Sequence, residues 1–246
     1  MANSTYIPFD HTYIVYDPKQ PWTLILALSS ILPIIILIFL FSWFLTDREL
    51  EPCIIAGGQV VNDLISTLLK QKIRFARPIK GQIFKKDGHL VYGMPSSHSQ
   101  FIMFFSTYMI LKMSYQWPYH IERIYKIGAI TSLLLGIGLI IYSRLFFSYH
   151  TIDQVIVGCF LGTFLSCGYF GAISILRDYG LLNWFLKWKV CELLRIKDSF
   201  HTSKYRTLKE ERNTWEDNFI DEQINEAQNK LSLIHISEPT RLQLIS

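Results

Sequence analysis

Long apolar runs, separated by short polar or charged stretches, occupy most of the chain up to residue 176. The first run, from Trp22 to Leu45, contains no formally charged residue and is longer than the roughly 20 residues that a bilayer-spanning helix needs. A soluble domain of this size would break its apolar residues into shorter periodic stretches. The pattern predicts a membrane span here, with Pro33 inside it, because membrane helices carry proline more often than soluble helices do.

Four further apolar runs bring the expected number of spans to about five. They cover residues 53–69, 99–113, 127–142 and 151–176. The sequence therefore predicts an all-α protein, a polytopic membrane helix bundle with about five transmembrane helices.

The expected organisation has four parts. An N-terminal segment over 1–21 precedes the transmembrane domain over 22–176, and an amphipathic and polar tail follows over 177–230. In that tail Trp184 and Trp188 lie four residues apart, as on one face of an interfacial helix. Residues 231–246 contain LSLIHISEPTR, which resembles the translation of a transposon adapter used in sequencing libraries, and we expect them to be non-native.

Charge and cysteine content exclude several classes of protein. The net charge of +4 is no nucleic-acid footprint, because the basic residues lie at the ends of apolar runs. The cysteines show no CxxC and no zinc-ligand spacing, and we interpret them as small core hydrophobes: Cys53, Cys159, Cys167 and Cys191. No spacing of His, Cys and carboxylate residues suggests a metal site, so we expect neither metal nor cofactor.

Polar residues continue along one face of the second run. Asn62, Ser66 and Lys70 are spaced by four, and Asp63 lies close to the same face. Ionisable groups in membrane segments are costly and are by default candidates for function. For Asn62, Asp63 and Ser66 a helix-packing hydrogen-bond ladder explains the pattern better than catalysis does.

Three cations follow this face. If the helix continues one or two turns beyond the membrane, Lys70, Arg74 and Arg77 share a narrow arc, and Pro78 ends the helix. Three cations on one arc repel each other unless an anion lies between them. A basic collar that reaches the lipid headgroups explains them equally well, and the two interpretations stay open at this point.

Further polar groups stand at the ends of the other runs. In GMPSSHSQ, Ser96 or Ser97 can cap the third helix, whose first N–H groups form an anion site, and His98 follows in the same turn. Arg144 ends the fourth run and His150 opens the fifth. Because successive spans alternate in direction, all these ends lie on one side of the bilayer, where anion-seeking groups converge.

Three motifs in this region resemble a known family. KQKIRFARP, PSSH with Ser97 in place of a glycine, and SRLFFSYH are similar, in this order, to the three signature motifs of the type-2 phosphatidate phosphatase superfamily, which includes lipid phosphatases and vanadium haloperoxidases. The resemblance covers Lys70 to about Gly158 and implies the helical core of that superfamily. Gln154 stands where the family usually has an aspartate, with Asp153 one residue earlier. In this the chain is similar to the fungal-type dolichyl diphosphate phosphatases.

The resemblance implies a role for each motif residue. It places phosphate oxygens against Lys70, Arg77, Ser96, Ser97 and Arg144. His150 is implied as the nucleophile that forms a phosphohistidine, and His98 as the general acid and base. Either Gln154 or Asp153 can orient His150, since both reach the same face, and the family register favours Gln154. The cations replace a metal.

The implied activity is hydrolysis of dolichyl diphosphate to dolichyl phosphate and phosphate, in dolichol recycling for protein N-glycosylation. The implied partners are the polyprenyl lipid and the bilayer, without nucleic acid or metal. The resemblance implies a multi-pass protein of the endoplasmic reticulum membrane. We expect its active site and residues 1–21 to face the lumen and its tail to face the cytosol. Lys and Arg mark the cytosolic side of a membrane protein, and several of those at the active-site end are left out of the count because they are expected to bind phosphate. A broader phosphatase of phosphatidate or sphingoid phosphates, a phosphotransferase and a non-catalytic scaffold remain alternatives.

Overall fold

The computed structural model describes residues 20–79, 92–115 and 123–198, together with isolated positions between 212 and 228. Clustering of contacts divides the chain into two units, Met1–Trp117 with Glu122–Thr202, and Pro118–Ile121 with Ser203–Ser246. The first unit contains all the helices named below. Residues 1–19 of the predicted N-terminal segment 1–21, and the predicted non-native residues 231–246, lie outside the described residues.

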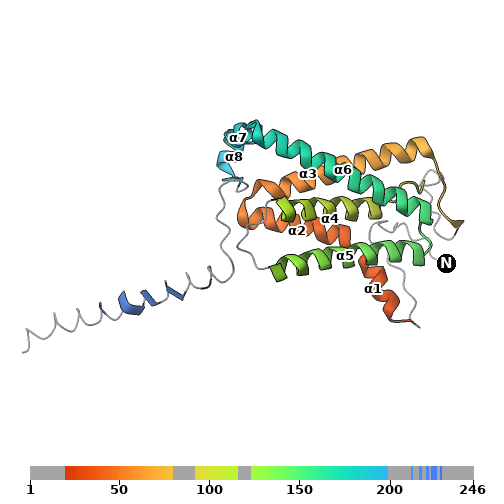
Figure 1. Cartoon of the computed structure of the whole chain (residues 1–246), viewed down its shortest axis with the longest axis horizontal. Helices are drawn as coiled ribbons and strands as arrows, with labels where there is room; N and C mark the ends of the chain where they lie inside the picture. Colours follow the sequence, from red (N-terminus) through yellow and green to blue (C-terminus); the bar gives the residue numbers. More distant parts are fainter. Residues whose placement is uncertain are drawn as a thin grey trace, which may run out of the picture. The chain divides into compact units, whose positions relative to one another are not determined.

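The first unit is a bundle of helices, and the all-α prediction is confirmed (Figure 1). Its helices are α1 (Trp22–Ser29), α2 (Leu32–Asp47), α3 (Leu50–Ile73), α4 (Ser97–Tyr115), α5 (Arg123–Phe146), α6 (Ile152–Asp178), α7 (Leu181–Leu186) and α8 (Lys189–Leu193). Over the described ranges there is no strand beyond one isolated parallel bridge, between Glu49 and Lys197. The expected interfacial helix in the tail is two short helices, and the rings of Trp184 and Trp188 meet edge to face at 5.1 Å.

Three of these helices, α3, α5 and α6, are long and apolar enough to cross a membrane, and the α1–α2 pair adds a fourth if its two halves form one span. This supports a multi-pass membrane protein. The third expected span forms helix α4, which does not reach the hydropathy of the others. It packs against α3, α5 and α6, and a helix enclosed by protein does not need an apolar surface all round.

The first apolar run is not one continuous helix, contrary to the expectation. It bends by 55° between α1 and α2. Pro33 lies in the first turn of α2, where its missing N–H costs nothing, but a continuous helix would press its ring against the carbonyl of Ser29. The helix therefore breaks at Ser30, and the break turns this residue toward the end of α5.

Helices α4 and α6 lie unusually close because two glycines of α6 face α4. A Cβ atom at Gly158 would lie 2.7 Å from the backbone oxygen of Ser96, and one at Gly162 would lie 2.3 Å from that of Gln100. Small residues allow such backbone approach between membrane helices. The contact fixes the start of α4 against the start of α6, where the polar motifs lie.

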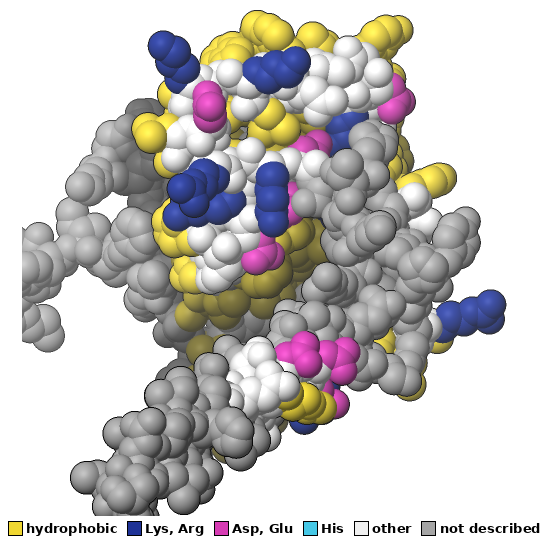
Figure 2. Space-filling view, turned by 90° about the vertical axis from the view of Figure 1, so that its left-hand side faces the viewer, with side chains coloured by type: hydrophobic (Ala, Val, Ile, Leu, Met, Phe, Trp, Pro, Cys, Tyr) yellow, Lys and Arg dark blue, Asp and Glu magenta, His cyan; other side chains and the backbone are white. Residues whose placement is uncertain are grey.

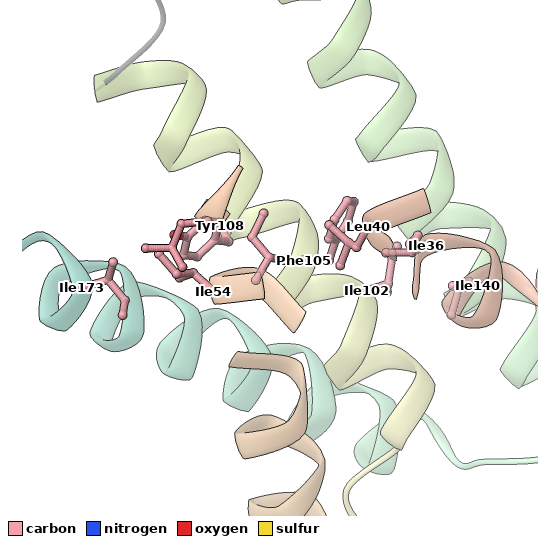
Figure 3. Close-up of a cluster of buried hydrophobic side chains, with 10 residues drawn as sticks. Ile36, Leu40, Ile54, Ile102, Phe105, Tyr108, Ile140 and Ile173 are labelled. Atoms are coloured by element: carbon pink, nitrogen blue, oxygen red, sulfur yellow. The ribbon is translucent and has the colours of Figure 1, made fainter. Parts of the chain in front are cut away.

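A buried apolar cluster runs along α4 and joins it to its neighbours (Figure 3). The residues labelled there come from five helices: Ile36, Leu40, Ile54, Ile102, Phe105, Tyr108, Ile140 and Ile173. In a bilayer these side chains would otherwise face apolar lipid, so the hydrophobic effect contributes little to their burial. Close packing between the side chains holds the helices together instead.

At the end of the bundle opposite the motifs, acidic and basic side chains lie next to one another (Figure 2). The buried Glu51 carboxylate accepts hydrogen bonds from Tyr108 at 2.8 Å and from Arg177, and it pairs with Lys112 at 3.1 Å. Arg177 also contacts Asp198 at 3.1 Å. These five residues, the paired cluster, tie α3, α4 and α6 to the segment that follows α8.

Candidate active site

Three chain segments meet at the other end of the bundle, and backbone hydrogen bonds hold them together. The segment after α3 is fixed by the N–H of Gly93, which donates to the carbonyl of Phe75 at 2.8 Å. The N–H of Ser96 donates to the carbonyl of Gln154 at 3.1 Å. The side chain of Gln154 donates to the carbonyl of Ala76 at 2.8 Å. All three motifs thus converge, as the alternation of spans predicted.

The turn between α5 and α6 places His150. Ser148 adopts a left-handed conformation with φ of 55°, and the N–H groups of Tyr149 and His150 both donate to the carbonyl of Arg144, at 3.0 and 3.3 Å. Thr151 then caps α6. This sharp turn folds His150 back over the end of α5, beside Arg144.

Gln154 fixes the orientation and the tautomer of His150. Its side-chain oxygen accepts from the N–H of Thr151 at 3.3 Å, and its side-chain nitrogen donates to the carbonyl of Ala76. These two backbone partners have fixed polarity, so they assign the amide oxygen and nitrogen. The oxygen also lies 3.0 Å from Nδ1 of His150. Nδ1 must therefore carry the proton, which leaves Nε2 with a free lone pair.

Asp153, the other candidate for orienting His150, lies on the exposed side of α6. Gln154 is fully buried and makes the contact to the imidazole. The geometry therefore supports Gln154 over Asp153 in this role.

Two of the expected phosphate-binding cations face hydroxyl groups. Lys70 donates to the hydroxyl of Ser97, which also lies 3.4 Å from the hydroxyl of Ser66. The buried Arg144 donates to the hydroxyl of Ser30, and its guanidinium lies 4.8 Å from the ring centre of Tyr149. Across the described ranges neither cation forms a salt bridge, and Nε of Arg144 has no hydrogen-bond partner there.

The expected arc of three cations on one helix is wrong. Helix α3 ends at Ile73, because Arg74 takes a left-handed conformation with φ of 52°. Pro78 also disfavours a helical conformation at the residue before it, Arg77. Arg74 is exposed, and its Nε donates to the carbonyl of Gln71. Arg77 instead reaches the site from the segment after α3, within electrostatic range of Lys70, Arg144 and His150.

Ser96 and Ser97 differ in what they offer a ligand. Ser96 is fully buried, its N–H is bonded to Gln154, and its hydroxyl accepts from Ser99 at 3.0 Å. Ser97 lines a pocket and contacts Lys70. The structure brings Ser97 to the site and gives Ser96 a place in the packing of α4 against α6.

His150 is neutral in this setting. It is buried, and burial lowers the pKa of its imidazole to about 3, with Arg77 as the next largest cause and the hydrogen bond that Nδ1 donates to Gln154 opposing them. A neutral imidazole with a free Nε2 is a nucleophile. His98, in the first turn of α4, lies near the same cations.

Ser30 was not singled out in the sequence, and the helix-packing prediction holds for Asn62 and Ser66 but not for Asp63. Ser30 holds Arg144 and lines the same pocket as His98. The sequence does contain a signal for a role of Ser30, because the polar pair Ser29–Ser30 precedes Pro33 inside an otherwise apolar run. Asn62 accepts from Gln100 of α4 at 2.7 Å, and the hydroxyl of Ser66 lies 3.4 Å from that of Ser97, whereas Asp63 is exposed and lines the pocket.

A pocket of about 340 Å³ leads to the site from between α2, α3 and α4. Pro33, Ile34 and Leu37 contribute apolar side chains to its lining, and the polar lining residues include Asp63, Ser97 and His98. The apolar residues of this lining suit a molecule with an apolar chain. Within the described residues, no three His, Cys, Asp or Glu side chains are grouped so that they could hold a metal ion.

Comparison with known proteins adds independent information. The PAP2 superfamily matches residues 51–177. The chain is 40% identical over 212 residues to Dolichyldiphosphatase of Saccharomyces cerevisiae, which covers 85% of this chain and 87% of the relative. It is 28% identical over 201 residues to Dolichyldiphosphatase 1 of Homo sapiens, with 78% and 82% covered. A Bacillus subtilis transmembrane PAP2 type phosphatidylglycerolphosphate phosphatase has a similar fold, with a TM-score of 0.50, 20% identity, and 64% and 79% covered.

Proposed function

The chain belongs to the PAP2 superfamily and is a phosphatase, and we propose that it hydrolyses dolichyl diphosphate to dolichyl phosphate and phosphate through a phosphohistidine on His150. One observation carries the mechanism. Buried or half-buried cations stand around a neutral histidine whose Nε2 is free, and two of them, Lys70 and Arg144, contact hydroxyl groups and no carboxylate in the part of the chain that the structure describes. Phosphate oxygens supply the missing negative charge.

In the first step, Nε2 of His150 attacks the terminal phosphorus. The N–P bond forms as the bond to the bridging oxygen breaks, and dolichyl phosphate leaves. Charge on the non-bridging oxygens is stabilised by Lys70, Arg77 and Arg144, which is most of the work in phosphoryl transfer. The negative charge of the bound diphosphate favours the protonated form of His98, which donates this proton to the departing oxygen. The reaction needs no metal, because these cations supply the positive charge.

In the second step, water attacks the phosphohistidine. His98, now unprotonated, takes a proton from the water, phosphate forms, and the neutral imidazole of His150 is restored. Gln154 holds the ring in place through both steps, because its oxygen continues to accept from Nδ1.

The substrate assignment rests on the relatives and on the pocket. The names of the relatives at 40% and 28% identity state dolichyl diphosphate hydrolysis for those proteins. In this chain the apolar lining at Pro33, Ile34 and Leu37 suits the first isoprenyl units, whose remainder stays among the lipid tails. The headgroup then lies against Ser97 and His98.

We further propose that the protein lies in the endoplasmic reticulum membrane with the active-site end toward the lumen. The support is the distribution of Lys and Arg, which are enriched on the cytosolic side of membrane proteins. Phosphate binding explains the cations at the active-site end, so the basic residues at the opposite end and in the tail indicate the cytosolic side. Such a site regenerates dolichyl phosphate for N-glycosylation where the diphosphate is released. An engineered glycosylation sequon beyond Tyr115 should stay unmodified, and its modification would reverse this orientation.

The test of the activity is phosphate release by the purified protein in detergent. Dolichyl diphosphate, phosphatidate and a sphingoid phosphate are compared, each with excess EDTA. We expect full activity in EDTA, inhibition by vanadate, and the highest kcat/KM on dolichyl diphosphate. A preference for phosphatidate would instead identify a broader lipid phosphatase, and activity that disappears in chelator and returns with magnesium would refute the metal-free mechanism.

A further inference from the structure

We propose that Gln154, the side chain that holds the nucleophile, also selects diphosphate headgroups over monophosphate headgroups because it is neutral. The inference rests on the proposed function and names the feature that sets its substrate class. It starts from the three partners of the Gln154 amide. Two of them, the N–H of Thr151 and Nδ1 of His150, require an acceptor, and the third, the carbonyl of Ala76, requires a donor.

A carboxylate at this position would satisfy two of these partners and would face the third, the Ala76 carbonyl, without a proton to donate. An amide satisfies all three. The buried contact therefore favours a neutral side chain, and residue 154 adds no negative charge to the site. The other charged or titratable groups that act on His150 are Lys70, Arg77, Arg144 and His98, while Asp153 lies exposed and the carboxylate of Asp63 acts on Lys70.

The charge of this position matters more for one headgroup than for the other. A diphosphate monoester carries about one more negative charge than a phosphate monoester near neutral pH. One unit charge acting on another about 10 Å away, at an effective dielectric constant of about 20, changes binding on the order of tenfold. A negative charge at residue 154 would thus weaken the diphosphate more than the monophosphate, and a neutral amide preserves the preference for the diphosphate.

Reactivity points in the same direction. When Nε2 of His150 bonds to phosphorus, the ring gains a positive charge that a carboxylate would stabilise and an amide does not. A nucleophile held by an amide therefore suits a leaving group that departs readily. Lipid phosphate, released from a diphosphate, is such a group, whereas the lipid alkoxide from a monophosphate is far more basic.

The experiment compares Gln154→Glu with the wild type on dolichyl diphosphate and dolichyl phosphate. The measured quantity is the ratio of the two kcat/KM values, with diphosphate in the numerator. We expect this ratio to fall by about tenfold or more. The acidic limb of the pH–rate profile should also move to higher pH, because a carboxylate favours the protonated imidazole. Gln71→Glu makes the same chemical change at an exposed position of α3 and should leave both readouts unchanged.

Gln154→Met separates charge from hydrogen bonding. It is neutral and of similar size, so it should slow both substrates by similar factors and keep the ratio. Equal ratios in Gln154→Glu and Gln154→Met would overturn the inference, as would a ratio that falls equally in Gln71→Glu.

If the Glu variant is inactive, binding still gives the answer. Inorganic pyrophosphate should raise the Tm of the wild type in detergent more than inorganic phosphate does, and Gln154→Glu should narrow this difference. An unchanged difference would refute the charge argument. Failure of the proposed function has a different signature, since the wild type would then release no phosphate from dolichyl diphosphate.

Discussion

The two ends of the bundle use the same helices for opposite purposes. At one end, α3, α4 and α6 bring together Glu51, Lys112 and Arg177, and each charge has a partner of opposite sign within 3.1 Å. At the other end, the same three helices contribute Lys70, Ser97 and Gln154, where the cation faces a hydroxyl group and the nucleophile faces an amide.

This difference separates a structural site from a functional one. A buried ion pair whose charges are matched holds helices together, and removal of one partner leaves the other charge buried and uncompensated. Buried cations without carboxylates raise the free energy of the folded protein until an anion binds. If these cations bind phosphate as proposed, the ligand compensates their charge, and phosphate binding should stabilise the protein.

The largest effect on the active-site end should come from His98→Ala. We expect a loss of about 10²–10⁴-fold in kcat on a lipid monophosphate, where the alkoxide must be protonated as it leaves. The loss on dolichyl diphosphate should be smaller, since lipid phosphate departs with less help, but it should not vanish, because His98 also activates water. Both substrates are measured with both proteins, and equal losses would remove the leaving-group argument.

The same substitution at the two ends gives the sharpest contrast. Arg144→Met should lower kcat/KM by about 10²–10³-fold, because a group that stabilises phosphate charge is lost, while the Tm is kept or raised. Arg177→Met should leave the activity per folded molecule close to that of the wild type and destabilise the protein by about 3 kcal/mol, since Glu51 loses a buried partner.

Thermal unfolding and initial rates on both arginine variants decide this. A loss of activity in Arg177→Met without unfolding would mean that the paired cluster takes part in catalysis. A large drop in the Tm of Arg144→Met would mean that the active-site cations stabilise the empty fold.

Within the active-site end, neighbouring residues of α6 should differ. Gln154→Ala should cost about 10–100-fold in activity, because a buried hydrogen bond that orients the reacting imidazole is lost. Asp153→Asn, one residue earlier and exposed, should change the rate less. Rates measured at saturating substrate test this order, and a larger loss for the aspartate would move the orienting role to Asp153.

The smallest effect concerns pH and stability. The imidazole of His150 has a pKa of about 3 in the fold, against 6.5 ordinarily. Between these values the unfolded chain binds a proton that the folded protein does not, so the free energy of unfolding falls as the pH falls below 6.5. At pH 5 the loss is about 2 kcal/mol. Between pH 7.5 and 5.0 the Tm of His150→Asn should decrease less than the Tm of the wild type. Equal decreases in Tm would mean that His150 is not held neutral.

Much of the active-site end could be predicted from the sequence, because the motif residues stand at the ends of apolar runs. Alternation of spans then brings Lys70, Arg144 and His150 together. The paired cluster was not predicted, because Glu51, Lys112 and Arg177 are far apart in the chain and each looks like an ordinary residue at the end of a run. Their meeting depends on how the helices are rotated and staggered.

Local conformation set the other limits. The break before Pro33 was not predicted, because proline is tolerated in membrane helices. Whether such a helix bends depends on the contacts that neighbouring residues form in the bent conformation. Here Ser30 gains a contact with Arg144. The early end of α3 depends on the left-handed conformation of Arg74, for which the sequence has no glycine as a signal. The family register already favoured Gln154 over Asp153, and the contact of the Gln154 side chain with the carbonyl of Ala76 supports that choice.

The most direct test of the central claim is to look for the phosphoenzyme. Purified protein in EDTA is mixed with dolichyl diphosphate labelled in its terminal phosphate, quenched in alkali after a fraction of one turnover, and the protein-bound label is located by peptide mapping. The account predicts label on His150 in the wild type, chased into inorganic phosphate over time, and none in His150→Ala. Phosphate release without any label on His150, or continued turnover by His150→Ala, would contradict it.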